Sequence, residues 1–158
     1  MSAVSIDSQS FRDWLQSQKA HAELIAVSTQ AIDDYDSLNA SNDKASELLD
    51  RLASATEHAR FVVSEVALPL LSRIAVTSSE ARQRIHVMSH SRKMEMRRRS
   101  IQYLNGLPRE FCVDLLTRLL ADKSARNREY AARKIECHDL KQLLPLLEVT
   151  ISNETNQI

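Results

Sequence analysis

The sequence predicts an all-α fold, and three observations lead to that prediction. The chain has 158 residues but only one glycine and three prolines, whereas the tight turns of β-sheet proteins depend on glycine, proline and Asn-Gly pairs. Aromatic residues make up only 4% of the chain, so a core must be built from Leu, Ile, Val and Ala, which suits helices. Apolar residues also recur at helical spacing. The length is that of a single domain, residues 1–158.

Residues 8–67 are predicted to form an N-terminal antiparallel helical hairpin. Apolar residues within 8–35 fall close to one helical face, and a loop rich in Asp, Ser and Asn follows. The second helix begins near Asn42, a good N-cap residue. Its apolar stripe runs to residue 66, about six turns, and Pro69 ends or kinks the helix because proline lacks the backbone donor.

Shorter helices are predicted after Pro69. Thr77-Ser78-Ser79-Glu80 is a capping sequence that opens a helix ending at Met88. A helix is predicted over 92–104, and Asn105-Gly106 closes it. The next helix is predicted over 108–121, with Pro108 in its first turn, and another follows over 125–135. Asp139 caps a final helix, whose apolar face consists of Leu140, Leu143, Leu144, Leu147 and Ile151.

Two stretches of the chain align when the sequence is shifted by 31 residues. Ser91 to Leu104 reads SRKMEMRRRSIQYL, and Asp122 to Ile135 reads DKSARNREYAARKI. Each stretch has a capping residue, an arginine six positions later, then a small residue and an apolar residue, and a Leu-rich helix follows. The aligned arginines are Arg97 and Arg128.

This pattern resembles HEAT-like α-solenoid repeats, and the resemblance covers residues 67–158. It is carried by Leu115-Leu116, Leu119-Leu120, Asp122, Arg128 and Ala131-Ala132. Asn127 departs from the usual valine, and Ser91 from the usual aspartate. The resemblance implies a short solenoid over 68–158, in which Arg97, Asp122 and Arg128 form a structural ladder between neighbouring repeats. It also implies a binding role, although the ligand differs from one such solenoid to another.

Charge is segregated along a chain whose net charge is zero. Residues 1–66 carry five basic and eleven acidic side chains, and residues 67–134 carry fifteen basic and six acidic ones. The candidate binding residues in this basic middle are Arg84, Arg92, Arg98 and Arg99, which could attract phosphate or acidic protein surfaces. The preferred interpretation is a solvated face, or salt bridges to the acidic N-terminal hairpin, since the sequence offers no aromatic stacking platform.

No catalytic, cofactor-binding or metal site is predicted, and the chain is not expected to be an enzyme. Phosphate-cradling loops need several glycines within a few residues, and only Gly106 is present. His86 and His90 are four residues apart, but the sequence has no third potential metal ligand at a spacing typical of a metal site. Cys137-His138-Asp139 resembles a nucleophile and base in sequence, but adjacent residues do not usually meet in the required geometry.

The sequence favours a non-enzymatic protein-binding or scaffold module that presents a helical-repeat surface to another protein. The alternative is a nucleic-acid-binding protein that uses the basic 82–99 segment. Only two cysteines, no signal peptide and no membrane span in the sequence indicate a soluble cytoplasmic location. The apolar face of the final helix requires a partner protein, a tail that folds back, or a second copy of the chain in a homodimer.

Overall fold

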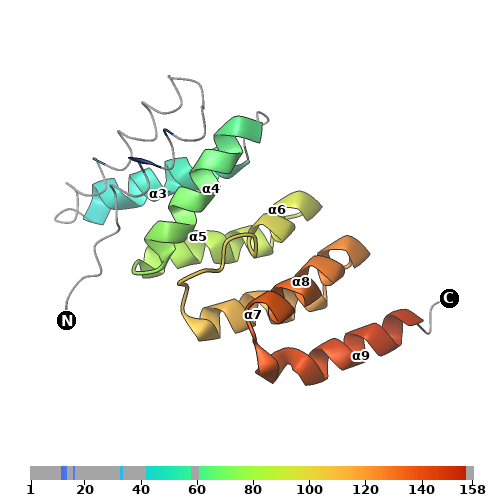
Figure 1. The fold of residues 1–158 in the computed structure, drawn as a ribbon. Coiled ribbons are helices and arrows are strands. Elements are labelled where there is room, and N and C mark those ends of the chain that lie inside the picture. The colour runs from blue at the N-terminus through green and yellow to red at the C-terminus, as the bar shows by residue number, and fades with distance from the viewer. Residues whose placement is uncertain (1–11, 14–15, 17–32, 34–41, 58–60, 156–158) are drawn as a thin grey trace. The chain divides into compact units, whose positions relative to one another are not determined.

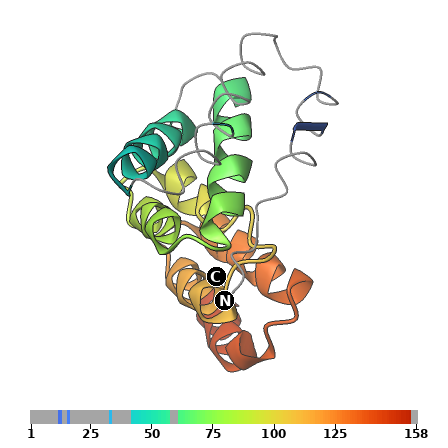
Figure 2. The ribbon, with the colours of Figure 1, turned by 90° about the vertical axis from the view of Figure 1, so that its left-hand side faces the viewer.

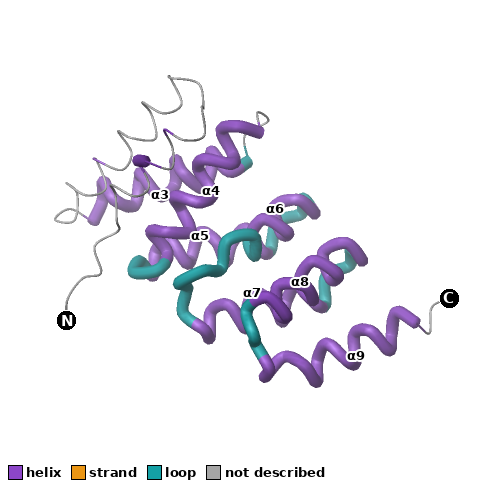
Figure 3. Tube along the Cα trace, in the orientation of Figure 1, coloured by secondary structure: helices purple, strands orange, loops and turns teal. Residues whose placement is uncertain are grey.

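The computed structural model of the protein is all-helical over the residues that it describes, 12–13, 16, 33, 42–57 and 61–155. These residues form seven α-helices and one short 3-10 helix, and no strand occurs among them (Figure 3). The elements are α3 (Asn42–Thr56), α4 (Phe61–Ala75), α5 (Ser79–Ser89), α6 (Met94–Arg99), α7 (Arg109–Leu120), α8 (Ala125–Cys137), η1 (Lys141–Leu143) and α9 (Leu144–Thr155). None of the described helices is both long enough and apolar enough to cross a bilayer.

The chain divides into two compact units, residues 1–85 and 86–158. In the first unit α3 packs against α4, and the two helices are neighbours in Figures 1 and 2. The first helix of the predicted hairpin, within residues 8–35, lies largely outside the described residues. Among those that are described, Arg12 forms an ion pair with Asp33.

The prediction of one long helix from Asn42 to residue 66 is wrong. Helix α3 ends at Thr56, whose hydroxyl donates to the carbonyl oxygen of Ala53 at 2.6 Å, and α4 then continues through Pro69 to Ala75. A proline inside a helix costs about 3 kcal/mol. Apolar residues on all sides of α4, from Val66 to Ala75, are buried, and this burial offsets that cost.

The predicted helix over 92–104 is also too long, because α6 ends at Arg99. After α6 the chain forms a tight turn, in which the N–H of Ile101 donates to the carbonyl oxygen of Arg98, three residues back. This turn directs Ile101 and Leu104 into the interior, where both are buried. Gly106 follows with φ 77°, a left-handed conformation that glycine adopts without steric cost.

In the second unit, helices pack both on their neighbours in sequence and on alternate helices. Helix α7 packs on α8, α6 on α8, and α7 on α9, as the lower part of Figure 1 shows for α7, α8 and α9. Leu115, Leu116 and Leu119 of α7 are fully buried. They form the centre of this unit.

Asp139 ends helix α8 rather than starting the final helix, so its predicted capping role is wrong. It has φ 49°, and the N–H of Leu140 bonds back to the carbonyl of Ile135 at 3.1 Å. This is the pattern of a left-handed helix C-terminus. The final helix α9 starts instead at Leu144, with Pro145 in its first turn, where proline is tolerated.

Candidate functional site

A buried ion pair joins α6 to the turn before α8. Arg97 donates from Nε and Nη2 to the two carboxylate oxygens of Asp122 at 2.6 and 2.9 Å. Its Nη1 donates to the carbonyl oxygens of Ser91 and Arg92, so every nitrogen of this buried guanidinium has an acceptor. The pair holds α6 and the α7–α8 turn in a fixed arrangement.

The two other polar residues of the repeat pattern lie beside this pair. Arg128 donates from Nη1 to the carbonyl oxygen of Asp122 at 2.7 Å. Asn127, which departs from the usual valine, is fully buried and donates from Nδ2 to the carbonyl oxygen of Met94 at 3.1 Å. The amide therefore makes a polar link between α8 and the start of α6 that a valine could not make.

The pair makes stability depend on pH in the acid range. Burial acts to raise the pKa of Asp122, but hydrogen bonds from Arg97 and from the N–H of Ser124 outweigh it and lower the pKa from 3.8 to about 2. A carboxyl with a depressed pKa stabilises the fold above its unfolded pKa and loses that contribution as pH falls through its folded pKa. We expect about 2 kcal/mol of unfolding free energy to be lost between about pH 5 and pH 2.

Urea unfolding at several pH values tests this expectation. The free-energy difference between the wild type and Asp122→Asn should shrink by that amount as pH falls, because the variant has no carboxyl to titrate. A difference that stays constant down to pH 2 would show that the carboxyl of Asp122 has an ordinary pKa in the folded chain.

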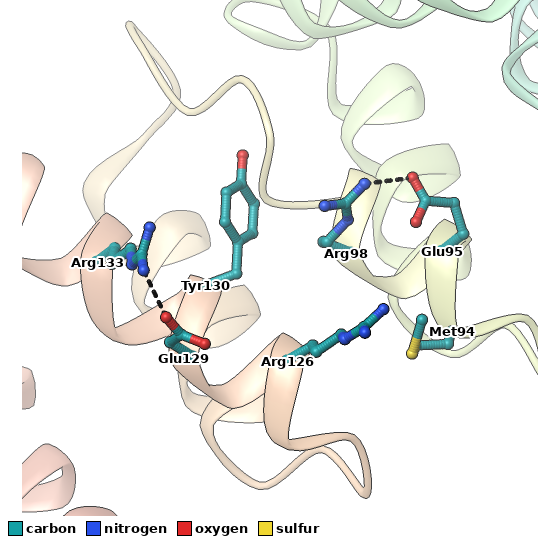
Figure 4. A pocket seen from close by; sticks show the side chains of 7 residues that line it. All are labelled: Met94, Glu95, Arg98, Arg126, Glu129, Tyr130 and Arg133. Carbon is teal, nitrogen blue, oxygen red and sulfur yellow. Dashed lines mark hydrogen bonds and ion pairs between the residues drawn. The ribbon is translucent and has the colours of Figure 1, made fainter. Parts of the chain in front are cut away.

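A groove between α6 and α8 is rich in arginine, and we call it the arginine groove (Figure 4). Its volume is about 420 Å³, and it is lined by Met94, Glu95, Arg98, Arg126, Glu129, Tyr130 and Arg133. Two of its arginines are paired within the groove, Arg98 with Glu95 at 2.6 Å and Arg133 with Glu129. Arg126 extends from α8 toward α6 in Figure 4, and no ion pair to another described residue is found for it.

Tyr130 provides an aromatic surface in this groove. The guanidinium of Arg98 lies 5.7 Å from the centre of its ring, and the ammonium of Lys134 lies 5.3 Å from it. Both distances are within the range of cation–π attraction. The aromatic ring beside Arg98 of the basic segment thus comes from α8, outside that segment. Burial lowers the pKa of Lys134, whose ammonium also donates to the carbonyl oxygen of Gln102 at 2.6 Å.

Of the four candidate binding arginines, only Arg98 lines the arginine groove. Arg84 belongs to the first unit, where it pairs with Asp50 at 3.1 Å and donates to Ser46. This is one of the salt bridges to the acidic N-terminal region that the charge pattern suggested. Arg92 is exposed, and the mostly buried side chain of Arg99 contacts Glu95 at 3.5 Å.

Sequence reasoning missed most of the groove residues, among them Arg126, Tyr130 and Arg133. These three are spaced at i, i+4 and i+7 in α8, which places them on one helical face. That spacing was visible in the sequence. What the sequence did not show was that α6 packs on α8 and brings Arg98 to the same face.

Glu95 forms ion pairs with two of the candidate binding arginines, Arg98 and Arg99, and remains ionised. Burial acts to raise the pKa of Glu95, but hydrogen bonds and charge from Arg98 and Arg99 lower it below the usual value. At neutral pH the groove therefore contains both signs of charge, with three arginines and two glutamates among the residues that line it.

A second groove lies between α7 and α9, and we call it the α9 groove. Its volume is about 580 Å³, and its lining includes Leu120, Lys123, Arg128, Leu146, Val149 and Asn153. It is the more apolar of the two. The residues Leu144, Leu146, Val149 and Ile151 of α9 are exposed, so this helix leaves much of its apolar surface uncovered within its own unit.

The three described histidines and both cysteines are absent from the linings of the two grooves. His86 Nδ1 is 3.5 Å from Asp114, and the His86 and His90 rings are 4.6 Å apart. No group of three metal-ligating side chains is found among the described residues. Cys112 is buried, and burial raises the pKa of its thiol, whereas Cys137 is exposed.

The chain matches no protein-family model, no curated protein and no solved structure.

Proposed function

We propose that this protein is a non-enzymatic binding module built from HEAT-like helix pairs after an N-terminal helical hairpin, and that its arginine groove binds an acidic segment of a partner protein. The solenoid part of this proposal is supported by the packing of alternate helices, α6 on α8 and α7 on α9. Stacked helix pairs make such second-neighbour contacts. The Arg97–Asp122 pair between α6 and the α7–α8 turn supports it as well.

The composition of the arginine groove carries the binding proposal. Arg, Tyr and Met are enriched at the centres of protein–protein interfaces, and Arg98, Arg126, Arg133, Tyr130 and Met94 make up most of this groove. Nucleic acid fits less well, because every nucleotide carries a phosphate and some of them would lie beside the carboxylates of Glu95 and Glu129, whereas a peptide can place apolar side chains there. A protein segment that carries acidic and apolar side chains can pair with Arg126 and contact the ring of Tyr130.

Selection from a phage-displayed library of short random peptides tests this proposal. The selected peptides are expected to be enriched in Asp, Glu and apolar residues. Their affinity should fall by about tenfold or more for Arg126→Glu, because a hydrogen bond to a charged group contributes roughly 1.5–3 kcal/mol. Arg126 is exposed, so this substitution should not disturb folding. Fluorescence anisotropy of a labelled selected peptide measures the affinity.

Arg118→Glu is the matched control, because Arg118 is an exposed arginine of α7 outside the groove. It should leave peptide affinity unchanged. Peptides without acidic enrichment, or an equal loss in both variants, would overturn the proposal. So would tighter binding of single-stranded oligothymidylate that weakens steeply between about 50 and 200 mM salt and is lost in Arg126→Glu, since that result assigns the groove to nucleic acid.

A further inference from the structure

The charges that line the arginine groove consist of two ion pairs and one further arginine. Glu95 pairs with Arg98 in α6 at 2.6 Å, and Glu129 pairs with Arg133 in α8. Arg126 extends from α8 toward α6 (Figure 4), and no acidic partner is found for it among the described residues. Because each pair is neutral as a whole, the net charge of the groove lining is that of one arginine.

The two glutamates of the groove are accessible to an incoming ligand. The side chain of Glu95 is 45% exposed and that of Glu129 is 62% exposed. Exposed ion pairs contribute at most about 1 kcal/mol to stability, so these two pairs matter little for folding. They matter more for recognition, because like charges that face each other across an interface lower affinity and exclude wrong partners. A ligand therefore loses affinity when it places a carboxylate beside Glu95 or Glu129.

The arginine groove also has apolar surface. Met94 is exposed, and its flexible thioether suits contacts with apolar and aromatic groups. The half-buried ring of Tyr130 offers a second surface of this kind. The groove thus combines one arginine that can bind an anion, two side chains that can contact uncharged groups, and two carboxylates that repel further negative charge.

We propose that the arginine groove selects a protein segment with one acidic side chain among apolar neighbours, and that Glu95 and Glu129 exclude runs of acidic residues and other polyanions. The single acidic side chain binds Arg126, and its neighbours contact Met94 and Tyr130. Glu95 and Glu129 are specificity-determining residues in this arrangement. The inference rests on the proposed function, because it names the class of protein segment that the same groove takes.

A fluorescein-labelled hexaglutamate peptide is the first probe, because it carries acidic side chains and no apolar ones. Fluorescence anisotropy at about 50 mM salt, where screening is limited, measures its binding to the full chain and to the double variant Glu95→Gln, Glu129→Gln. The wild type should bind it weakly. The double variant should bind it more tightly by about tenfold or more, because the two carboxylates that repel it are absent.

The double variant Glu110→Gln, Glu148→Gln is the matched control. It removes the same two charges at exposed positions of α7 and α9 that do not line the groove, so it should leave hexaglutamate binding close to that of the wild type. Adding Arg126→Glu to Glu95→Gln, Glu129→Gln should cancel the gain in affinity. That result would place the bound hexaglutamate in the arginine groove.

A peptide selected on the wild type is the second probe. Adding two glutamates beside its acidic residue should weaken its binding to the wild type and strengthen its binding to Glu95→Gln, Glu129→Gln. The sign of the effect therefore reverses between the two proteins. A loss of folding in the variant would lower its affinity for both peptides, so it cannot produce this reversal.

Equal hexaglutamate affinities of the wild type and Glu95→Gln, Glu129→Gln would overturn this inference. An equal gain in Glu110→Gln, Glu148→Gln, or a gain that persists with Arg126→Glu, would overturn it as well. In each case the proposed function stands as long as acidic and apolar peptides are selected and lose affinity in Arg126→Glu. Selected peptides without acidic enrichment would instead overturn the proposed function, so the two failures are distinguishable.

Discussion

Replacing Asp122 by asparagine is expected to lower the free energy of unfolding at neutral pH by about 3–5 kcal/mol, the usual cost of removing one partner of a buried ion pair. Arg97 is only 8% exposed and Asp122 9%. The variant therefore leaves the positive charge of Arg97 buried without its counterion, and it weakens the hydrogen bonds that fix the start of α8. Urea denaturation followed by far-ultraviolet circular dichroism measures the change.

Glu129→Gln is the control for this prediction, because it breaks an ion pair with Arg133 in which both side chains are exposed. Exposed pairs contribute at most about 1 kcal/mol. Comparable losses of unfolding free energy in Asp122→Asn and Glu129→Gln would contradict the prediction that burial makes the Arg97–Asp122 pair the more stabilising of the two. The double variant Arg97→Met, Asp122→Leu should recover much of the stability lost in Asp122→Asn, since it removes both charges together.

Leu116→Ala is expected to cost about 2–5 kcal/mol, the range for truncating a large side chain in a packed core. Leu116 has no exposed surface and lies on the buried face of α7. The loss combines reduced apolar burial with the cavity that remains when neighbouring helices cannot close around the alanine. The same urea denaturation experiment measures it.

The same substitution at Leu144 should cost less than about 1 kcal/mol, because that side chain is 46% exposed. The contrast between the two leucines tests whether the face of α9 is part of the folded core. A loss as large as that of Leu116→Ala would show that this face of α9 is covered within the chain.

Local signals in the sequence predicted the helical class and several helix boundaries correctly. Ser78 accepts a hydrogen bond from the N–H of Ala81 at 3.2 Å at the start of α5, as the capping sequence indicated. The break at Asp122 to Ser124 separates α7 from α8. Such features involve hydrogen bonds between residues a few positions apart, so neighbouring residue types are enough to reveal them.

The boundaries that failed depend on burial rather than on local preference. Pro69 normally interrupts a helix, but it lies inside α4 because apolar residues around it are buried on all sides. Asp139 resembles an N-cap in sequence, yet it adopts the left-handed conformation that ends α8. In both cases a residue had two acceptable local roles, and contacts with distant residues selected one of them.

By itself, the sequence predicted the helical class that the described residues show, and its resemblance to HEAT-like repeats implied a contact between Arg97 and Asp122. Only the tertiary structure decided where the charges meet. Arg84 pairs with Asp50, whereas Arg98 comes together with Tyr130 across the arginine groove. The physical reason is that helical periodicity assigns each residue to a face of its own helix, while the neighbour of that face depends on how helices pack.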